Sequence, residues 1–126
     1  MVQNTKPQRQ SILSSPPVSR MVEDIVGCKW SLAVLDAVRK NVVRPSSIRR
    51  SVDGISTKIL NERLSKMVRY GILVKESFPE VPPRVEYKLT EFGERFAAIL
   101  DQIEMLQAEV SNGKEGMRKN LSNNAL

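Results

Sequence analysis

The sequence predicts a mainly α fold with one small β-hairpin, which places the protein in the α+β class. Three observations support this prediction: apolar residues recur at helical spacing in several stretches, two short runs have strand-like composition, and glycine or proline separates these segments. The chain has 126 residues and 40% of them are hydrophobic, which suffices for one domain with a modest core. We expect that domain to span residues 18–111, between flexible tails at residues 1–17 and 112–126.

Two helices open the predicted domain. The first, residues 20–26, ends at Gly27, and the second, residues 29–40, has apolar side chains at helical spacing with Trp30 as a core anchor. A brief extended segment at residues 41–44 follows them. The inner face of the first helix is expected to consist of Met21, Val22, Ile25 and Val26.

A pair of helices joined by a short turn comes next. Ser46 is expected to cap a short helix at residues 47–51, and Ser56 to cap a longer helix that runs to residue 70. The buried stripe of the longer helix is expected to contain Leu60, Leu64, Met67 and Val68. At 100° per residue the opposite face is polar and contains Lys58, Glu62, Ser65 and Arg69. An ordinary amphipathic helix with a hydrated face would show the same pattern.

Two strand-like runs follow this helix. The runs "ILVKESF" and "VEYKL" both fit β-pairing, and the second alternates apolar with charged residues. The intervening "PEVPPR" is too long and too rich in proline for a tight two-residue turn. We expect it to protrude as a stiff loop with Arg84 at its base.

A final helix is expected to begin after Thr90. Its apolar residues recur at steps of four and three, which makes a narrow seam of coiled-coil type. Such a seam suits a partner helix, although it would also pack on its own domain. The seam consists of Phe92, Phe96, Ile99, Ile103, Leu106 and Val110.

Positive charge is concentrated in the middle of the chain. The formal net charge is +6, but residues 39–69 contain nine basic and two acidic residues, a balance of +7. Residues 91–109 contain five acidic residues and one basic residue, a balance of −4. This separation predicts a surface that binds a polyanion.

The composition argues against several other classes of function. The chain has no histidine and one cysteine, and it has neither a cluster with metal-ligand spacing nor a glycine-rich phosphate loop. We therefore expect no enzyme activity, no metal and no cofactor. It also lacks a recognisable signal peptide and any apolar run long enough for a membrane helix, so we expect a cytoplasmic protein that does not bind membranes.

The order of the predicted elements is that of a winged helix-turn-helix. In this motif the second helix of the pair enters the major groove of double-stranded DNA, the preceding helix crosses the backbone, and an arginine on the hairpin loop reaches the minor groove. We expect the recognition helix at residues 56–70 and the wing at residues 78–86. The candidate DNA-binding residues are Ser46, Ser47, Arg49, Arg50, Ser56, Thr57, Lys58, Asn61, Arg63, Lys66, Pro83 and Arg84.

The strings "GCKWSLAVLDAVRK", "GISTKILNERLSKMVRYGIL" and above all "EVPPRVEYKLTEFG" resemble the HxlR-type family of winged-helix transcription regulators. The resemblance implies a homodimer in the cytoplasm of a prokaryote, associated with the nucleoid, that regulates transcription. It also implies N- and C-terminal dimerisation helices, which adds Met21 and Ile25 to the residues of the seam. Whether a small-molecule effector is sensed stays open.

The chain departs from the family pattern at two places. Cys28 stands where "GGKW" has its second glycine; Lys29 and a helix N-terminus would make it a reactive, redox-sensing thiol, whereas a small buried residue beside Trp30 is the simpler interpretation. "NVVRPSSI" stands in place of "GPLRFSEL", so Pro45 replaces an aromatic residue and changes the entry into the short helix.

Two other functions fit the same fold. A winged helix also serves as a protein-interaction module, in which the basic face would bind an acidic partner. It also serves as a non-specific architectural DNA binder, for which affinity would not depend on base sequence.

Overall fold

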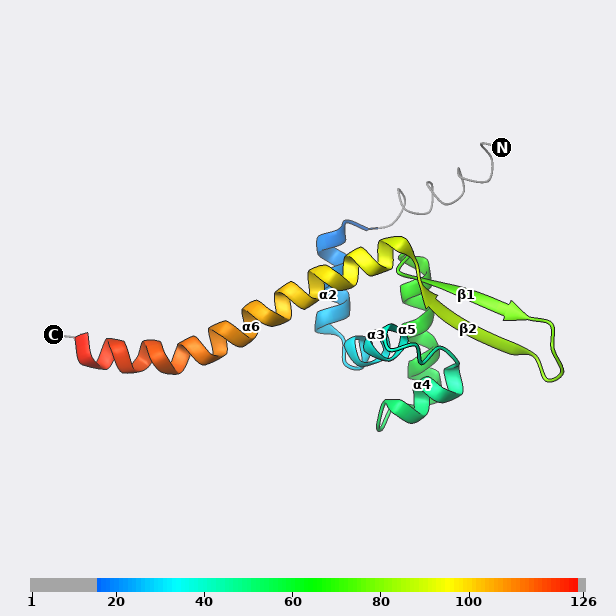
Figure 1. Cartoon of the computed structure of the whole chain (residues 1–126), viewed down its shortest axis with the longest axis horizontal. Coiled ribbons are helices and arrows are strands. Elements are labelled where there is room, and N and C mark those ends of the chain that lie inside the picture. The colour runs from blue at the N-terminus through cyan, green and yellow to red at the C-terminus, as the bar shows by residue number, and fades with distance from the viewer. Residues whose placement is uncertain (1–15, 125–126) are drawn as a thin grey trace. The chain divides into compact units, whose positions relative to one another are not determined.

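A computed structural model describes residues 16–124, and it describes side chains as far as residue 113 (Figure 1). Most of the predicted N-terminal tail, residues 1–15, and the last two residues lie outside the described residues. The described chain falls into two compact units, one that ends at Glu94 and one that begins at Arg95. Its elements are α2 (Val18–Gly27), α3 (Ser31–Arg39), α4 (Pro45–Ser51), α5 (Thr57–Arg69), β1 (Leu73–Phe78), β2 (Arg84–Leu89) and α6 (Glu91–Asn124). This order confirms the predicted α+β fold with a two-stranded hairpin.

Helix α2 packs on α3 through one face. Met21 and Ile25, one helical turn apart, are buried as predicted. Val26 is 46% exposed, so its predicted inward position is wrong, because one residue beyond Ile25 lies about 100° around the helix. Trp30, expected as a core anchor, is half-buried and precedes α3 in a left-handed conformation with a φ of 79°.

A side-chain hydrogen bond joins α2 to the end of α5. The Tyr70 hydroxyl donates to the Asp24 carboxylate. This hydrogen bond, followed by burial and by the negative charge of Asp24, raises the pKa of the Tyr70 phenol above its ordinary value. This hydrogen bond requires the protonated phenol of Tyr70. Its contribution to the stability of the fold is therefore fully present below the ordinary pKa of tyrosine, and it is lost as the pH rises through the raised pKa of Tyr70.

Helices α4 and α5 form the predicted pair, with one correction at the first boundary. Helix α4 begins at Pro45 with Arg44 in the capping position, so Ser46 lies inside the helix and is not its cap. Proline is favoured at the first helical position because its fixed φ suits the helix and its missing N–H has no partner there. Ser56 caps α5 as predicted, since its Oγ accepts from the Ile59 N–H at 3.1 Å.

The core side of α5 contains its apolar stripe. Leu60, Leu64 and Met67 are buried, together with Ile48 of α4 and with Val34, Leu35 and Val38 of α3. Helix α3 contacts both members of the pair. Burial of this stripe fixes which face of α5 remains outside.

The hairpin begins on the core of the unit that ends at Glu94 and extends away from α2, α3 and α5 (Figure 1). Its strands pair antiparallel, from Leu73 opposite Leu89 to Phe78 opposite Arg84. Leu73 is buried at the base, whereas Val81 at the tip is 100% exposed. A backbone hydrogen bond joins the hairpin to residues 41–44, which the sequence predicts as an extended segment. In it the Tyr87 N–H donates to the Val43 carbonyl at 2.9 Å.

Thr90 links the hairpin to α6. Its Oγ1 accepts from the Gly93 N–H at 2.8 Å, which confirms the predicted cap, and it lies 2.5 Å and 3.2 Å from the Gly71 and Ile72 carbonyl oxygens. Glycine suits position 71 because its φ is 76°.

Helix α6 ends later than the sequence predicts. It continues to Asn124, through residues expected to form the C-terminal tail. Glycine in a helix costs about 1 kcal/mol relative to alanine but does not by itself end the helix, and Gly113 lies within α6. In the unit that begins at Arg95, the buried side chains within the described part are Phe96, Ala97 and Leu100.

Candidate nucleic-acid interface

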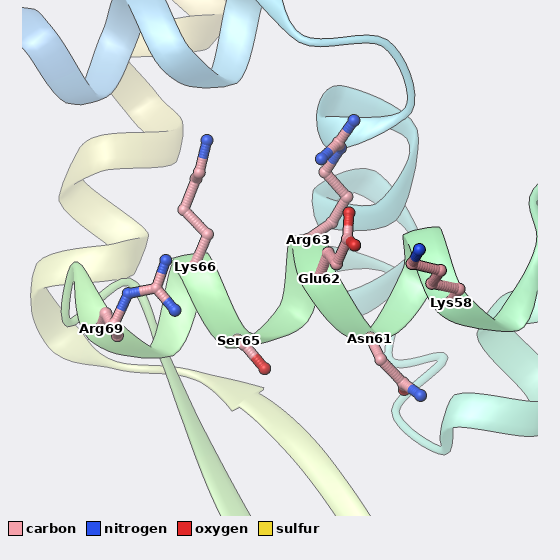
Figure 2. A pocket seen from close by; sticks show the side chains of 7 residues that line it. All are labelled: Lys58, Asn61, Glu62, Arg63, Ser65, Lys66 and Arg69. Carbon is pink, nitrogen blue, oxygen red and sulfur yellow. The ribbon is translucent and has the colours of Figure 1, made fainter.

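The outer face of α5 is polar and basic at its N-terminal end. Thr57, Lys58 and Asn61 are exposed there; at 100° per residue Lys58 lies opposite the buried stripe and Asn61 lies on its flank. Figure 2 shows Asn61 and Ser65 pointing to one edge of the helix, and Arg63 and Lys66 to the other. The helix therefore presents hydrogen-bonding side chains along one edge and, along the other, the cations Arg63 and Lys66 together with the carboxylate of Glu62.

Two of the predicted α5 residues have roles within the fold. The Oγ of Ser56 accepts the capping hydrogen bond, which uses one of its two acceptor lone pairs and holds the side chain against the start of the helix. The Nε of Arg63 donates to the Lys29 carbonyl at 3.1 Å, and the Lys29 ammonium lies 4.8 Å from the centre of the Trp30 ring. Arg63 thus joins α5 to the turn before α3, a contact between residues too far apart in sequence for a pattern to predict.

Helix α4 turns polar side chains outward on the side away from Ile48. Ser46 and Arg49 are exposed, and Ser47 is half-buried. The Arg50 guanidinium donates to the Ser47 hydroxyl at 3.3 Å, which partly orients both groups. Within the described part of the chain, Arg49 makes no ion pair.

The wing arginine is bound by its own hairpin. Arg84 lies 3.0 Å from the Glu80 carboxylate and 3.4 Å from that of Glu86, and its guanidinium is 4.2 Å from the centre of the Phe78 ring. Its side chain is 29% exposed. Residues two apart on a strand share a face, so the contact with Glu86 follows from the strand period, a signal the sequence contains. Pro83, beside Arg84, is exposed.

Lys88 extends this set of ion pairs toward the base of the wing. Its ammonium lies 2.8 Å from Glu76 and 3.7 Å from Glu86. The hydrogen bond to Glu76 is the largest cause of a raised pKa for Lys88. The wing therefore has cations that are already paired with carboxylates.

Comparison with known proteins identifies the family. The model of the HxlR-like helix-turn-helix family matches residues 25–115. The chain belongs to this family. The HTH-type transcriptional regulator YtfH of Escherichia coli K12 is 38% identical over 96 residues, which cover 73% of this chain and 76% of YtfH.

Solved structures show that the HxlR-like chain shares its fold with other regulators. A MarR-family transcriptional regulator of Enterococcus faecalis V583 matches with a TM-score of 0.69 and 30% identity, covering 76% of this chain and 87% of that one. Diamide-treated YodB of Bacillus subtilis matches with a TM-score of 0.65 and 25% identity, covering 79% and 95%. The protein is a winged helix-turn-helix transcriptional regulator.

The residues predicted for a dimer interface differ in exposure in this HxlR-like chain. Met21 and Ile25 are buried within the chain, so the part of α2 open to a partner consists of other residues, such as the exposed Val18. Of the seam, Phe96 is buried and Phe92 is half-buried. The exposed seam residues are Ile99, Ile103, Leu106 and Val110.

Cys28 is a free, half-buried cysteine at the end of α2. The sequence allows two interpretations of this residue, a buried core residue or an accessible reactive thiol. The half-buried position of Cys28 does not decide between them. Among the described residues, no group of His, Cys, Asp or Glu is arranged to hold a metal ion. No described helix combines the length and apolarity needed to cross a membrane.

Proposed function

We propose that residues 18–111 form a homodimeric regulator that binds double-stranded DNA at a specific inverted repeat. Helix α5 lies in the major groove and the wing, residues 78–86, lies at the adjacent minor groove. The exposed polar N-terminal half of α5, opposite a fully buried apolar stripe, is the observation that supports this proposal most directly.

The chemistry of the exposed α5 residues suits base reading. Asn61 carries an amide, which pairs in a bidentate manner with the N6 and N7 atoms of adenine. Lys58 carries an ammonium that donates to the O6 and N7 acceptors of guanine, and Thr57 has both a hydroxyl and a methyl group. All three are exposed near the start of the helix, which is the part that approaches base edges in this motif.

The cations around α5 suit the DNA backbone. Arg49 and Arg50 lie on α4, which precedes the recognition helix, and Lys66 lies on the basic edge of α5 (Figure 2). Backbone contacts fix the orientation of the protein on the duplex without reading sequence. They also explain why nine of the basic residues fall in residues 39–69.

A dimer is supported by the apolar residues that α6 leaves exposed. Ile99, Ile103, Leu106 and Val110 follow steps of four, three and four, so they form one stripe along the helix. Exposed apolar stripes of this kind mark contact surfaces. A two-fold dimer of this chain would place its two α5 helices on half-sites of opposite orientation, which makes the site an inverted repeat.

Replacing Asn61 or Lys58 by alanine should cost roughly 1 to 3 kcal/mol on the correct site and relax base preference at one position of each half-site. Binding to a panel of duplexes with single base changes measures this effect. Arg49→Ala is the matched control, because removal of a phosphate-binding cation should weaken binding to every duplex by the same factor. An Asn61→Ala protein that discriminates as well as the wild type would remove Asn61 from the base-reading residues.

A further inference from the structure

A groove lies between the start of α4 and the tip of the wing. Arg44 and Ser46 line one side of it, and the wing contributes Glu80, Val81, Pro82 and Arg84. Because α4 also contacts β2, both walls of the groove belong to one compact unit. The two arginines in this groove differ sharply in the partners they have.

The positive charge of Arg84 is already balanced. Arg84 and Lys88 form ion pairs with three carboxylates, those of Glu76, Glu80 and Glu86. This group of five side chains has a net charge of −1. Lys75, on β1, brings the whole hairpin to zero. A phosphate that approached Arg84 would have to displace one of these carboxylates or meet the negative charge of the set.

Arg44 is in the opposite situation. Its side chain is exposed, and it makes no hydrogen bond or ion pair with any part of the chain that the structure describes. Its backbone is nevertheless fixed, because its carbonyl accepts from the Ile48 N–H at 2.8 Å and the neighbouring Val43 carbonyl accepts from β2. A guanidinium on a fixed backbone, open toward a groove, suits a ligand with paired oxygen acceptors such as a phosphate.

We propose that Arg44 binds a phosphate of the DNA backbone in this groove, and that Arg84 is a positioning residue that holds the wing tip. This inference rests on the proposed function. By bridging Glu80 in the loop and Glu86 in the strand, and by lying over Phe78, Arg84 fixes the loop against β2. Val81, at the tip of this loop, is fully exposed.

The test compares the salt dependence of two variants on a mixed-sequence duplex of about 30 base pairs, roughly three helical turns. Arg44→Gln removes the proposed phosphate-binding cation. The double variant Arg84→Gln with Glu80→Gln removes the ion pair that holds the loop against β2. It leaves the net charge of the wing unchanged, because one cation and one anion are lost together. The measured quantity is the slope of log K against log salt, whose magnitude falls by about 0.9 for each phosphate that the protein no longer neutralises.

We expect Arg44→Gln to reduce the slope by about 0.9 per chain. The double variant should keep the wild-type slope and weaken binding by a similar factor at every salt concentration, as a positioning role requires. A reduced slope in the double variant would overturn the assignment and make Arg84 the phosphate-binding residue. An unchanged slope in Arg44→Gln would also overturn it.

Two controls separate these outcomes from other causes. Arg49→Gln, on the outer face of α4, should reduce the slope whether or not the groove contacts DNA. If neither the wild type nor Arg49→Gln shows salt-dependent binding, the proposed function fails and the groove assignment fails with it. If both do and Arg44→Gln keeps the wild-type slope, the groove assignment alone fails. Thermal unfolding of each variant establishes that it is folded. Arg44, Arg49 and Glu80 are exposed and Arg84 is half-buried, so no substitution removes a buried core residue.

Discussion

Gly93→Ala should destabilise the protein by about 3 kcal/mol, which corresponds to a fall of about 12 °C in Tm. A Cβ at position 93 would lie 2.0 Å from the Ile72 carbonyl oxygen and 2.9 Å from its carbonyl carbon. These are backbone atoms, which cannot rotate away as a side chain does. Relief would require separation of the start of α6 from the segment that joins α5 to β1, which also disturbs the hydrogen bonds of Thr90.

Gly113→Ala is the matched control for this substitution. Gly113 also lies in α6, but nothing approaches its Cβ position within 4 Å. Alanine there should leave Tm unchanged or raise it, because alanine favours the helix by about 1 kcal/mol over glycine. Thermal unfolding followed by circular dichroism measures both variants. If Gly93→Ala melted at or above the wild-type temperature, the close approach to Ile72 would be refuted.

Ile103→Asp should convert the proposed homodimer into a monomer. The residue lies in the middle of the exposed α6 stripe and is 37% exposed in a single chain. A carboxylate at the centre of an apolar interface would lose its water without gaining a partner, which costs several kcal/mol. Sedimentation should show the mass of one chain in place of two. Affinity for an inverted repeat should fall about 100-fold or more, because the two half-sites are then bound independently.

Ala108→Asp provides the control for Ile103→Asp. Position 108 is exposed and lies nearly opposite the stripe at 100° per residue. Aspartate there imposes the same charge and a larger loss of helix propensity, because alanine favours the helix more than isoleucine does, yet the dimer should persist. A dimer that survives Ile103→Asp would exclude the α6 stripe and direct attention to the exposed side of α2.

The elements and the polar face of α5 are predictable because their signals are local. The cap at Ser56 and the stripe through Leu60, Leu64 and Met67 depend on residues within a few turns of one another. Local signals also locate the hairpin and the cap at Thr90. They misplace the start of α4, where Pro45 at the first helical position outweighs the serine that follows it.

The roles of the arginines are harder to predict, because they depend on the fold. Arg63 donates to Lys29, a residue 34 positions away, and no periodicity contains that information. Arg84 has the expected place in the wing, but the hairpin register pairs it with carboxylates. In the sequence, Arg44 is only one of the basic residues of the central segment. Its position beside the wing emerges when α4 and β2 come together.

Selection of bound sequences from a random pool of double-stranded DNA, at about 150 mM salt, tests the central claim most directly. Specific reading by a two-fold dimer predicts enrichment of a palindrome whose half-sites lie about one helical turn apart. General binding without enrichment, weakened by added salt, would contradict specific reading and indicate an architectural role. The absence of any DNA binding would contradict the account as a whole and favour a protein-interaction module.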